Sequence, residues 1–381
     1  MCPKPLPNKS VDFHSAWLAL LAPLFPTVLG CVSNASPASP ARSAQIAAPS
    51  REPSLNPPLV IGHRGASGHR PEHTLEAYDL AISMGADFIE PDLVPTKDGV
   101  LIARHENLID ETTDVALRFP SRKATKTIEG KSVNGYFTED FTLAEIKSLR
   151  ARERLEFRNH AYDGKFVVPT FDEVLALAKR RGAERGRPVG VYPETKHSSY
   201  FRKMGVPLEE PLVAALEGAG LNRADAPVFI QSFEVGNLKA LKLKTPVRLV
   251  QLIGGEGQPP DLMASGDTRT YADLATPAGL DEIRTYATGI GPFKNLIVPV
   301  GPKGELGAPT SLVKDAHVRG LVVHPWTFRN EARYLAPAFA KDPGKEIALF
   351  LSLGVDGIFS DFPDTAVAAR DVYVVRGKLP K

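Results

Sequence analysis

Two acidic residues, Glu90 and Asp92, are separated by a single position at the end of a short apolar run. Alternate residues of a β-strand face the same side, so a strand here would place both carboxylates together, where their charges repel. A divalent cation relieves that repulsion, and carboxylate oxygens suit Mg²⁺ or Ca²⁺ better than softer metals. The alternative is a solvated pair on an edge strand. The apolar flanks and two nearby histidines favour the metal site.

Those histidines, His63 and His105, each follow an apolar run of their own. Imidazole exchanges protons near neutral pH, and the guanidinium of Arg64 can bind two phosphate oxygens at once. The turn residues 97–99, Lys-Asp-Gly, predict a hairpin that folds His105 back toward the carboxylates. A single histidine of this kind is usually structural. Two that converge on a carboxylate pair indicate general acid/base chemistry.

Further motifs continue this pattern over about residues 58–370. In chain order, the set is His63-Arg64-Gly65, Pro71-Glu72-His73-Thr74, Glu90-x-Asp92, Thr96-Lys97-Asp98, His105, Tyr192-Pro193-Glu194-Thr195-Lys196, Gln231-Ser232-Phe233, Val250-Gln251-Leu252-Ile253, Gly289-Ile290-Gly291-Pro292, Val323-His324-Pro325-Trp326-Thr327 and Gly357-Ile358-Phe359-Ser360-Asp361-Phe362-Pro363-Asp364. In content and order, these motifs resemble the glycerophosphodiester phosphodiesterase family, and specifically its secreted bacterial branch.

The resemblance implies a phosphoric diester hydrolase that converts glycerophosphodiesters to sn-glycerol 3-phosphate and an alcohol such as choline, ethanolamine or glycerol. It implies that Glu194 joins Glu90 and Asp92 as a third metal ligand, with Ca²⁺ as the expected cation and Mg²⁺ as the alternative. His63 and His105 would then be the catalytic proton carriers. Either water or the glycerol hydroxyl of the substrate could be the nucleophile.

Four residues are expected to bind substrate. The resemblance makes Lys196 a phosphate-facing cation, and Arg64 is expected to clamp another phosphate oxygen. Trp326 and Gln231 stand at the ends of expected strands, where Trp326 could form a wall of the site. Alternatives stay open: Glu194 and Lys196 could form a surface ion pair, and Trp326 could belong to the core. Asp361 is expected either to support the site or to cap the following helix.

Two other functions compete with this interpretation. One is a lysophospholipase D-like activity, which would require an apolar groove for an acyl chain. The other is a surface protein that binds phosphodiesters without turnover, although binding alone needs no catalytic base. A formal net charge of +2, with no basic stripe and interleaved aromatics, gives no support to nucleic-acid binding. A homodimer is left open.

The chain has 381 residues, of which 43% are hydrophobic, so it can form one large domain. Short apolar, β-rich runs alternate with amphipathic stretches that include 74–84, 170–181, 207–219 and 234–243. The expected strands are 59–63, 87–92, 189–194, 227–232, 246–252, 295–300, 320–326 and 357–361. Eight such units predict an α/β fold, a (β/α)₈ TIM barrel, with an open doubly wound sheet as the alternative.

The predicted barrel domain spans 58–375, with a small inserted subdomain at about 107–168, after the second β-unit. Two features depart from the family pattern. Glu106 stands where an aspartate often follows the second histidine, and Asp110 and Glu111 are acidic where an arginine is common. These departures leave the shape and charge of the leaving-group pocket open.

Residues 1–30 read as an export signal, because two lysines precede an apolar run that is too short and too interrupted to span a membrane. The Gly30-Cys31 pair resembles a lipoprotein processing site. The alternative is cleavage near Ala35 or Ala38. Residues 31–57 are rich in Ser, Ala and Pro and predict a flexible tether. We therefore expect an exported protein, either periplasmic or lipid-anchored to a bacterial membrane. The only two cysteines precede the predicted domain, which excludes a disulfide within it.

Overall fold

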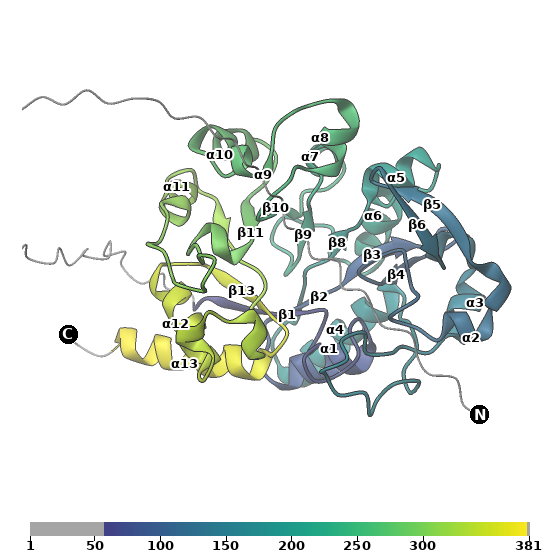
Figure 1. The fold of residues 1–381 in the computed structure, drawn as a ribbon, viewed down its shortest axis with the longest axis horizontal. Coiled ribbons are helices and arrows are strands. Elements are labelled where there is room, and N and C mark those ends of the chain that lie inside the picture. Colours follow the sequence, from purple (N-terminus) through teal and green to yellow (C-terminus); the bar gives the residue numbers. More distant parts are fainter. Residues whose placement is uncertain (1–56, 379–381) are drawn as a thin grey trace, which may run out of the picture. The chain divides into compact units, whose positions relative to one another are not determined.

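The computed structural model describes residues 57–378. The predicted export signal, Cys31 and all but the last residue of the predicted tether lie outside this range. Strands and helices alternate along most of the chain (Figure 1), so the α/β prediction is confirmed. In the described part of the chain, no helix is long and apolar enough to cross a membrane.

Most strands belong to two sheets, in which all pairs are parallel except β3 with β4. The strands are β1 (Leu59–His63), β2 (Phe88–Glu90), β3 (Asp92–Pro95), β4 (Leu101–Ala103), β5 (Ala124–Ile128), β6 (Lys131–Gly135), β7 (Gly190–Val191), β8 (Glu194–Thr195), β9 (Phe229–Ser232), β10 (Arg248–Ile253), β11 (Gly289–Pro292), β12 (Val322–Val323) and β13 (Gly357–Ser360). One sheet has the order β13-β1-β2-β7, and the other has the order β12-β11-β10-β9-β8-β3-β4. Isolated parallel bridges join the two edge strands of the first sheet to residues outside the strands, Val191 of β7 to Val228 and Ser360 of β13 to Phe328.

The helices follow the strands and cover them on the outside (Figure 1). They are α1 (Leu75–Ser83), α2 (Val115–Arg118), α3 (Leu143–Ser148), α4 (Phe171–Arg185), α5 (Ser198–Lys203), α6 (Glu209–Gly218), α7 (Val235–Lys242), α8 (Pro260–Ser265), α9 (Tyr271–Leu274), α10 (Pro277–Ile283), α11 (Leu312–Val318), α12 (Pro343–Ser352) and α13 (Pro363–Lys378). Sequence signals explain two of the starts. The Thr74 hydroxyl accepts a hydrogen bond from the Ala77 N–H to begin α1, and Thr170 with Glu173 forms a capping box at α4.

Apolar side chains are buried on both faces of the strands, as expected for parallel strands. One face contributes to a small inner cluster that consists of Ile61, Phe88, Tyr192, Phe229, Val250 and Phe359. The other face packs under the helices in a much larger cluster, to which Val60, Ile89 and Ile230 belong. Strands held on both faces give the polar residues at their ends fixed positions.

One predicted strand is wrong. Residues 295–300 were expected to form a strand because they are apolar and β-branched, but a 3₁₀ helix (Lys294–Leu296) and a turn lie there. The strand is instead β11, which contains two glycines and a proline. A Cβ at Gly289 would come within 2.5 Å of the Val322 side chain, and one at Gly291 within 2.6 Å of Leu252. Close packing against neighbouring strands therefore overrides the low β-propensity of this segment.

The chain between β4 and α4 forms the hairpin β5–β6 and the short helices α2 and α3. Ile109, Phe141 and Ile146 from this segment join the large cluster, so it packs on the same core as the strands. Its boundaries as a subdomain, 107–168, stay a prediction. The turn at 96–100 does connect antiparallel strands, because β3 pairs with β4, and this confirms the predicted hairpin.

Candidate active site

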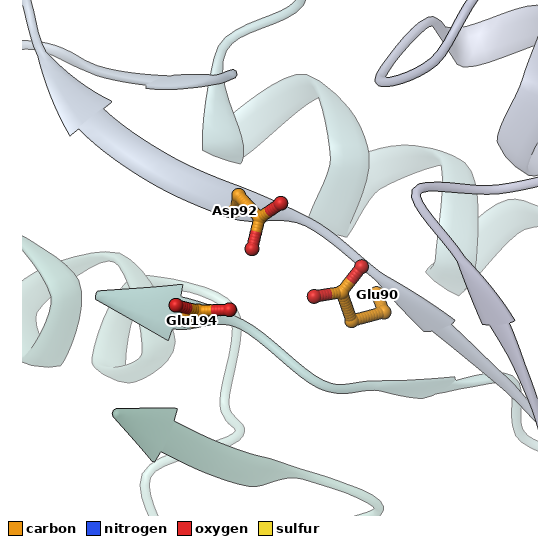
Figure 2. A group of neighbouring side chains, drawn as sticks. All are labelled: Glu90, Asp92 and Glu194. Carbon is orange, nitrogen blue, oxygen red and sulfur yellow. The ribbon is translucent and has the colours of Figure 1, made fainter. Parts of the chain in front are cut away.

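Three buried carboxylates converge where strands of the two sheets meet. Glu90 ends β2, Asp92 begins β3 and Glu194 begins β8, and oxygen atoms of all three lie within 4.8 Å of one another (Figure 2). Strand register brings them together, since Asp92 is the parallel partner of Glu194 and His63 is that of Glu90. Among the described residues, this is the one group of carboxylate, histidine or cysteine side chains placed closely enough to hold a metal ion.

The electrostatics of this carboxylate cluster favour a bound cation. Burial, together with the charges of Asp92 and Glu194, raises the pKa of Glu90 well above its usual range. Burial raises the pKa of Glu194 to about 8, although Lys196 opposes the shift. Burial alone would also raise the pKa of Asp92, but His73 and Lys196 hold it well below its usual value. Without a bound cation, protons on Glu90 and Glu194 must therefore relieve the repulsion among the three carboxylates.

The oxygen atoms of the cluster also fit a metal. Asp92 Oδ1 is buried and has no hydrogen-bond partner among the described residues. The oxygens of Glu90 accept from the Arg64 backbone N–H (2.8 Å) and from Gln231 Nε2 (3.0 Å), which fixes the carboxylate and leaves lone pairs available. A buried orphan oxygen is costly unless something binds it. An all-oxygen donor set of this kind suits Mg²⁺ or Ca²⁺.

His63, the last residue of β1, lies beside this cluster. Its Nδ1 is 2.6 Å from Asp361 Oδ1, because β1 pairs with β13 and Asp361 directly follows β13. Asp361 Oδ2 in turn accepts from Arg158 (2.6 Å) and Arg329 (2.8 Å). Burial, reinforced by Arg64, lowers the pKa of His63 to about 4 although Asp361 opposes this. The ring is therefore neutral at pH 7, with a proton on Nδ1 and a lone pair on Nε2.

His105 has the same arrangement with different partners. Its Nδ1 is 2.9 Å from Glu106 Oε1, and its Nε2 is 3.4 Å from Lys196 Nζ. Since an ammonium can only donate, Nε2 carries the lone pair here too. Burial, together with Arg64 and Lys196, lowers the pKa of His105 below its usual value. The side chain is 32% exposed, against 11% for His63, so it lies closer to solvent.

The two candidate phosphate-binding cations are both held by carboxylates. Arg64 Nη1 lies 3.1 Å from each oxygen of Glu72, and its Nε has no hydrogen-bond partner among the described residues. Lys196 Nζ lies 2.9 Å from Glu194 Oε1, and both side chains are buried. The alternative of a surface ion pair is therefore wrong.

Gln231 and Trp326 flank the cluster in different ways. Gln231 pairs in register with Glu194 and donates to Glu90, so it braces the carboxylate cluster. Trp326 is partly exposed, donates from Nε1 to the Gly291 carbonyl (2.7 Å), and its ring contacts Phe233 and Phe293. Trp326 thus belongs to an aromatic wall with one side toward solvent.

From the sequence, several residues at the site received no role or only a minor one. His73 is fully buried between Asp92 Oδ2 (2.8 Å) and the Tyr78 hydroxyl (2.7 Å), and it could have been chosen from its motif. Asp361 was given only a supporting or capping role, yet it accepts from His63 and two arginines. Arg158 and Arg329 lie in irregular connections, and no sequence signal marks them.

The backbone is strained where these networks meet. Among the described residues, four that are not glycine have positive φ, namely Arg64 (58°), His73 (55°), Glu129 (48°) and His197 (50°). Such conformations cost about 1–3 kcal/mol each and persist where surrounding structure imposes them. Arg64 and His73 contact the carboxylate cluster, and His197 and Glu129 belong to the network around His105. Strain thus concentrates at the candidate site.

Comparison with known proteins identifies the family. The profile of the glycerophosphoryl diester phosphodiesterase family matches residues 63–365. The chain belongs to this family. It is 40% identical to the glycerophosphodiester phosphodiesterase GDPD6 of Arabidopsis thaliana, over 80% of this chain and 84% of the relative. Enzymes of the same name from Bacillus subtilis (33% identical, 90% and 94% covered) and Haemophilus influenzae (32%, 81% and 88%) are also similar. The predicted class of phosphoric diester hydrolase is confirmed at this level.

Solved structures share the fold. A phosphodiesterase of this family from Silicibacter pomeroyi has a TM-score of 0.58 at 20% identity, covering 83% of this chain and 95% of its own. A phosphodiesterase of Oleispira antarctica, solved in complex with the product sn-glycerol-3-phosphate, has a TM-score of 0.54 at 19% identity and covers 83% and 97%. The arrangement of strands and helices in this chain is therefore one that phosphodiesterases of the family use.

Proposed function

We propose that this protein hydrolyses glycerophosphodiesters to sn-glycerol 3-phosphate and an alcohol, with a divalent cation held by Glu90, Asp92 and Glu194. The observation that carries the proposal is one cluster of three buried carboxylates flanked by two histidines, each with a carboxylate on Nδ1. Binding alone would not need two oriented proton carriers. Family membership and the relatives of the same name support the choice of substrate class.

The cation, when bound, supplies positive charge to a phosphate oxygen. Ca²⁺ is the first choice and Mg²⁺ the alternative. Arg64 and Lys196 bind further phosphate oxygens, and both are held by carboxylates, Glu72 and Glu194, that keep them at the cluster. Because this positive charge is in position before the reaction begins, it stabilises the extra negative charge that develops in the transition state.

His63 and His105 move the protons. In both rings Nδ1–H is tied to a carboxylate, so Nε2 is the atom that exchanges protons with the attacking oxygen or the leaving alcohol. One ring acts as base and the other, once protonated, as acid. Trp326 forms a wall for the part of the substrate beyond the phosphate, and Gln231 supports the site through Glu90.

For the fold, we propose that the two sheets are arcs of one (β/α)₈ barrel with the segment 107–168 inserted over its mouth. The isolated parallel bridges from β7 and β13 support this closure.

We further propose export, as in the secreted bacterial branch of the family, with a lipid on Cys31. The proposals of export and of a lipid anchor rest on the sequence of residues 1–57 alone. Intact mass of protein from the native host tests the anchor, and an unmodified N-terminus beyond Cys31 would contradict it. Sedimentation tests a homodimer.

A substrate panel tests the function. The full chain is incubated with glycerophosphocholine, glycerophosphoethanolamine or lysophosphatidylcholine, each with EDTA, Ca²⁺ or Mg²⁺. Release of sn-glycerol 3-phosphate that requires a cation supports the proposal. Choline release from lysophosphatidylcholine alone would indicate a lysophospholipase D-like enzyme. Binding of glycerophosphocholine by calorimetry without any turnover would indicate a binding protein.

A further inference from the structure

The carboxylate that orients His105 is itself held by a second histidine. Glu106 Oε1 lies 2.9 Å from His105 Nδ1, and Glu106 Oε2 lies 2.7 Å from His197 Nε2. Both oxygens of Glu106 are therefore engaged by ring nitrogens. His105 and Glu106 are partly exposed, at 32% and 44% of their side chains, so neither is fixed by packing alone.

His197 is fixed from its other side. Its Nδ1 lies 2.7 Å from Glu129 Oε1, so each ring nitrogen faces one carboxylate. Burial would lower the pKa of His197, but Glu106 and Glu129 raise it to about 9. The ring is therefore an imidazolium at pH 7, with two N–H donors and two carboxylate acceptors. A continuous series of hydrogen bonds runs from His105 through Glu106 and His197 to Glu129.

Glu129 lies in an unusual place for its residue type. The pairing of Ile128 with Lys131 leaves a two-residue turn, Glu129-Gly130, at the tip of hairpin β5–β6, with φ values of 48° and 78°. Turns with positive φ at both central residues strongly prefer Asn or Asp before Gly. Figure 1 shows this hairpin beside α5, which His197 precedes, and His197 also has positive φ. The contact thus joins two strained residues.

We propose that Glu106, His197 and Glu129 are positioning residues that hold His105 with Nε2 free to exchange protons, so that turnover depends on hairpin β5–β6 being docked. The proposal rests on the proposed function for its kinetic readout. The position of the proton on the His105 ring, in contrast, can be measured without any substrate. None of the three needs to touch the substrate, so they should affect kcat more than KM.

The first test replaces Glu106 by Gln. His105 and His197 bond to different oxygens of Glu106, and Gln has an NH₂ group that cannot accept in one of those two positions. One ring therefore loses its acceptor, and His105 should lose its fixed tautomer. We expect kcat for glycerophosphocholine to fall by about 10²-fold, the scale that misplacing a catalytic group produces, with KM within about threefold of wild type. Ca²⁺ affinity and the unfolding temperature should be unchanged. The exposed Glu217 on α6, replaced by Gln, provides a charge-matched control with wild-type kcat.

The second test replaces the two residues of the hydrogen-bond series that lie furthest from His105, His197 and Glu129. We expect His197→Ala and Glu129→Ala each to reduce kcat about tenfold. Glu129→Gln keeps an acceptor for His197 and should lose less than Glu129→Ala. The double variant should lose no more than His197→Ala alone, because the two residues act through one contact. Multiplied losses, or kcat at the wild-type level in all of these variants, would overturn the proposal.

A spectroscopic measurement separates this proposal from the proposed function. The ¹⁵N shifts of the His105 ring report which nitrogen carries the proton, with or without turnover. We expect Nδ1–H in wild type and a mixture of tautomers in Glu106→Gln. Wild-type protein that hydrolyses no glycerophosphodiester but shows this tautomer change would refute the proposed function alone. Unchanged ring shifts in Glu106→Gln would refute the positioning role even in an active enzyme.

Discussion

His63 and His105 have the same immediate chemistry but different surroundings. The carboxylate on His63 is Asp361, which is buried and held by Arg158 and Arg329. The carboxylate on His105 is Glu106, which is 44% exposed and held by one histidine. Arginine and a buried aspartate form charge-assisted bonds that persist at any physiological pH. The orientation of His63 is therefore fixed in the core, whereas that of His105 depends on contacts near the surface.

This difference teaches that the same histidine–carboxylate geometry can be fixed in two ways. Core packing of β1 against β13 fixes His63 without any flexible element. His105 depends on a hairpin tip that contacts the network through a single glutamate. Substitutions among the partners of His63 should lower folding stability as well as activity. Substitutions among the partners of His105 should lower mainly activity.

The largest expected effect comes from removing either histidine. His63→Ala and His105→Ala should each reduce kcat by about 10²–10⁴, the usual contribution of a positioned proton carrier, while Ca²⁺ binding by calorimetry stays intact. Glu90→Ala or Asp92→Ala should instead weaken Ca²⁺ binding and regain some activity with excess metal. If His105→Ala lost Ca²⁺ but turned over normally when Ca²⁺ was supplied, His105 would be a ligand.

The next prediction tests the comparison directly through stability. Asp361→Asn leaves two arginines facing a neutral group in a buried place, so the free energy of unfolding should fall by about 3 kcal/mol. Glu106→Gln changes an ion pair whose carboxylate is half-exposed, and its partner His197 keeps Glu129, so the cost should be less, about 1 kcal/mol. Urea unfolding of the two variants measures both values. Equal losses of unfolding free energy in the two variants would show that Asp361 and Glu106 contribute equally to stability.

A smaller effect is expected from pH on metal binding. The pKa of Glu194 is raised to about 8, so below pH 8 it holds a proton that Ca²⁺ must displace. Affinity should therefore rise at least about tenfold per pH unit from pH 6 toward pH 8, because Glu90, whose pKa is also raised, adds to the protons that the cation displaces. Without metal, this group makes the folded state bind more protons than the unfolded chain, so stability should fall as pH rises over the same window. Calorimetry measures the change of Ca²⁺ affinity with pH, and thermal unfolding without metal measures the change of stability. A Ca²⁺ affinity that does not depend on pH would contradict the first expectation.

The smallest effect should follow deletion of residues 1–53. That segment has no apolar periodicity outside the predicted export signal, and every residue named in the two histidine networks lies within 57–378. A chain that begins at Ser54 should keep its kcat and unfold cooperatively at the same temperature. Loss of cooperative unfolding would move the domain boundary toward the N-terminus.

Much of the candidate site could be predicted because its side chains lie at the ends of strands. Apolar runs before His63, Glu90 and Glu194 are local signals, and these residues do lie at the ends or starts of β1, β2 and β8. The false strand at 295–300 shows the limit of that approach, since β11 is selected by the space beside Gly289 and Gly291. Such space depends on neighbouring strands and is invisible in one sequence.

The partners of the two histidines could not be predicted for a different reason. Asp361 reaches His63 only because β13 pairs with β1, and Arg158 arrives from an irregular segment 203 positions away from Asp361. Glu129 reaches the network because a turn places it against His197. These contacts join parts of the chain that no periodicity or motif relates. Sequence patterns identified the chemistry, whereas pairing and loop conformation determined which groups orient it.

The pairing of β1 with β13 also affects the order of events during synthesis. His63 and Asp361 are 298 positions apart, and the strand that brings them together is the last one in the described chain. Contacts of such long range form late, because the intervening chain must first be ordered. A nascent chain on the ribosome therefore carries His63 long before its carboxylate exists. His63 therefore acquires the carboxylate that orients its ring only after β13 and Asp361 have been synthesised.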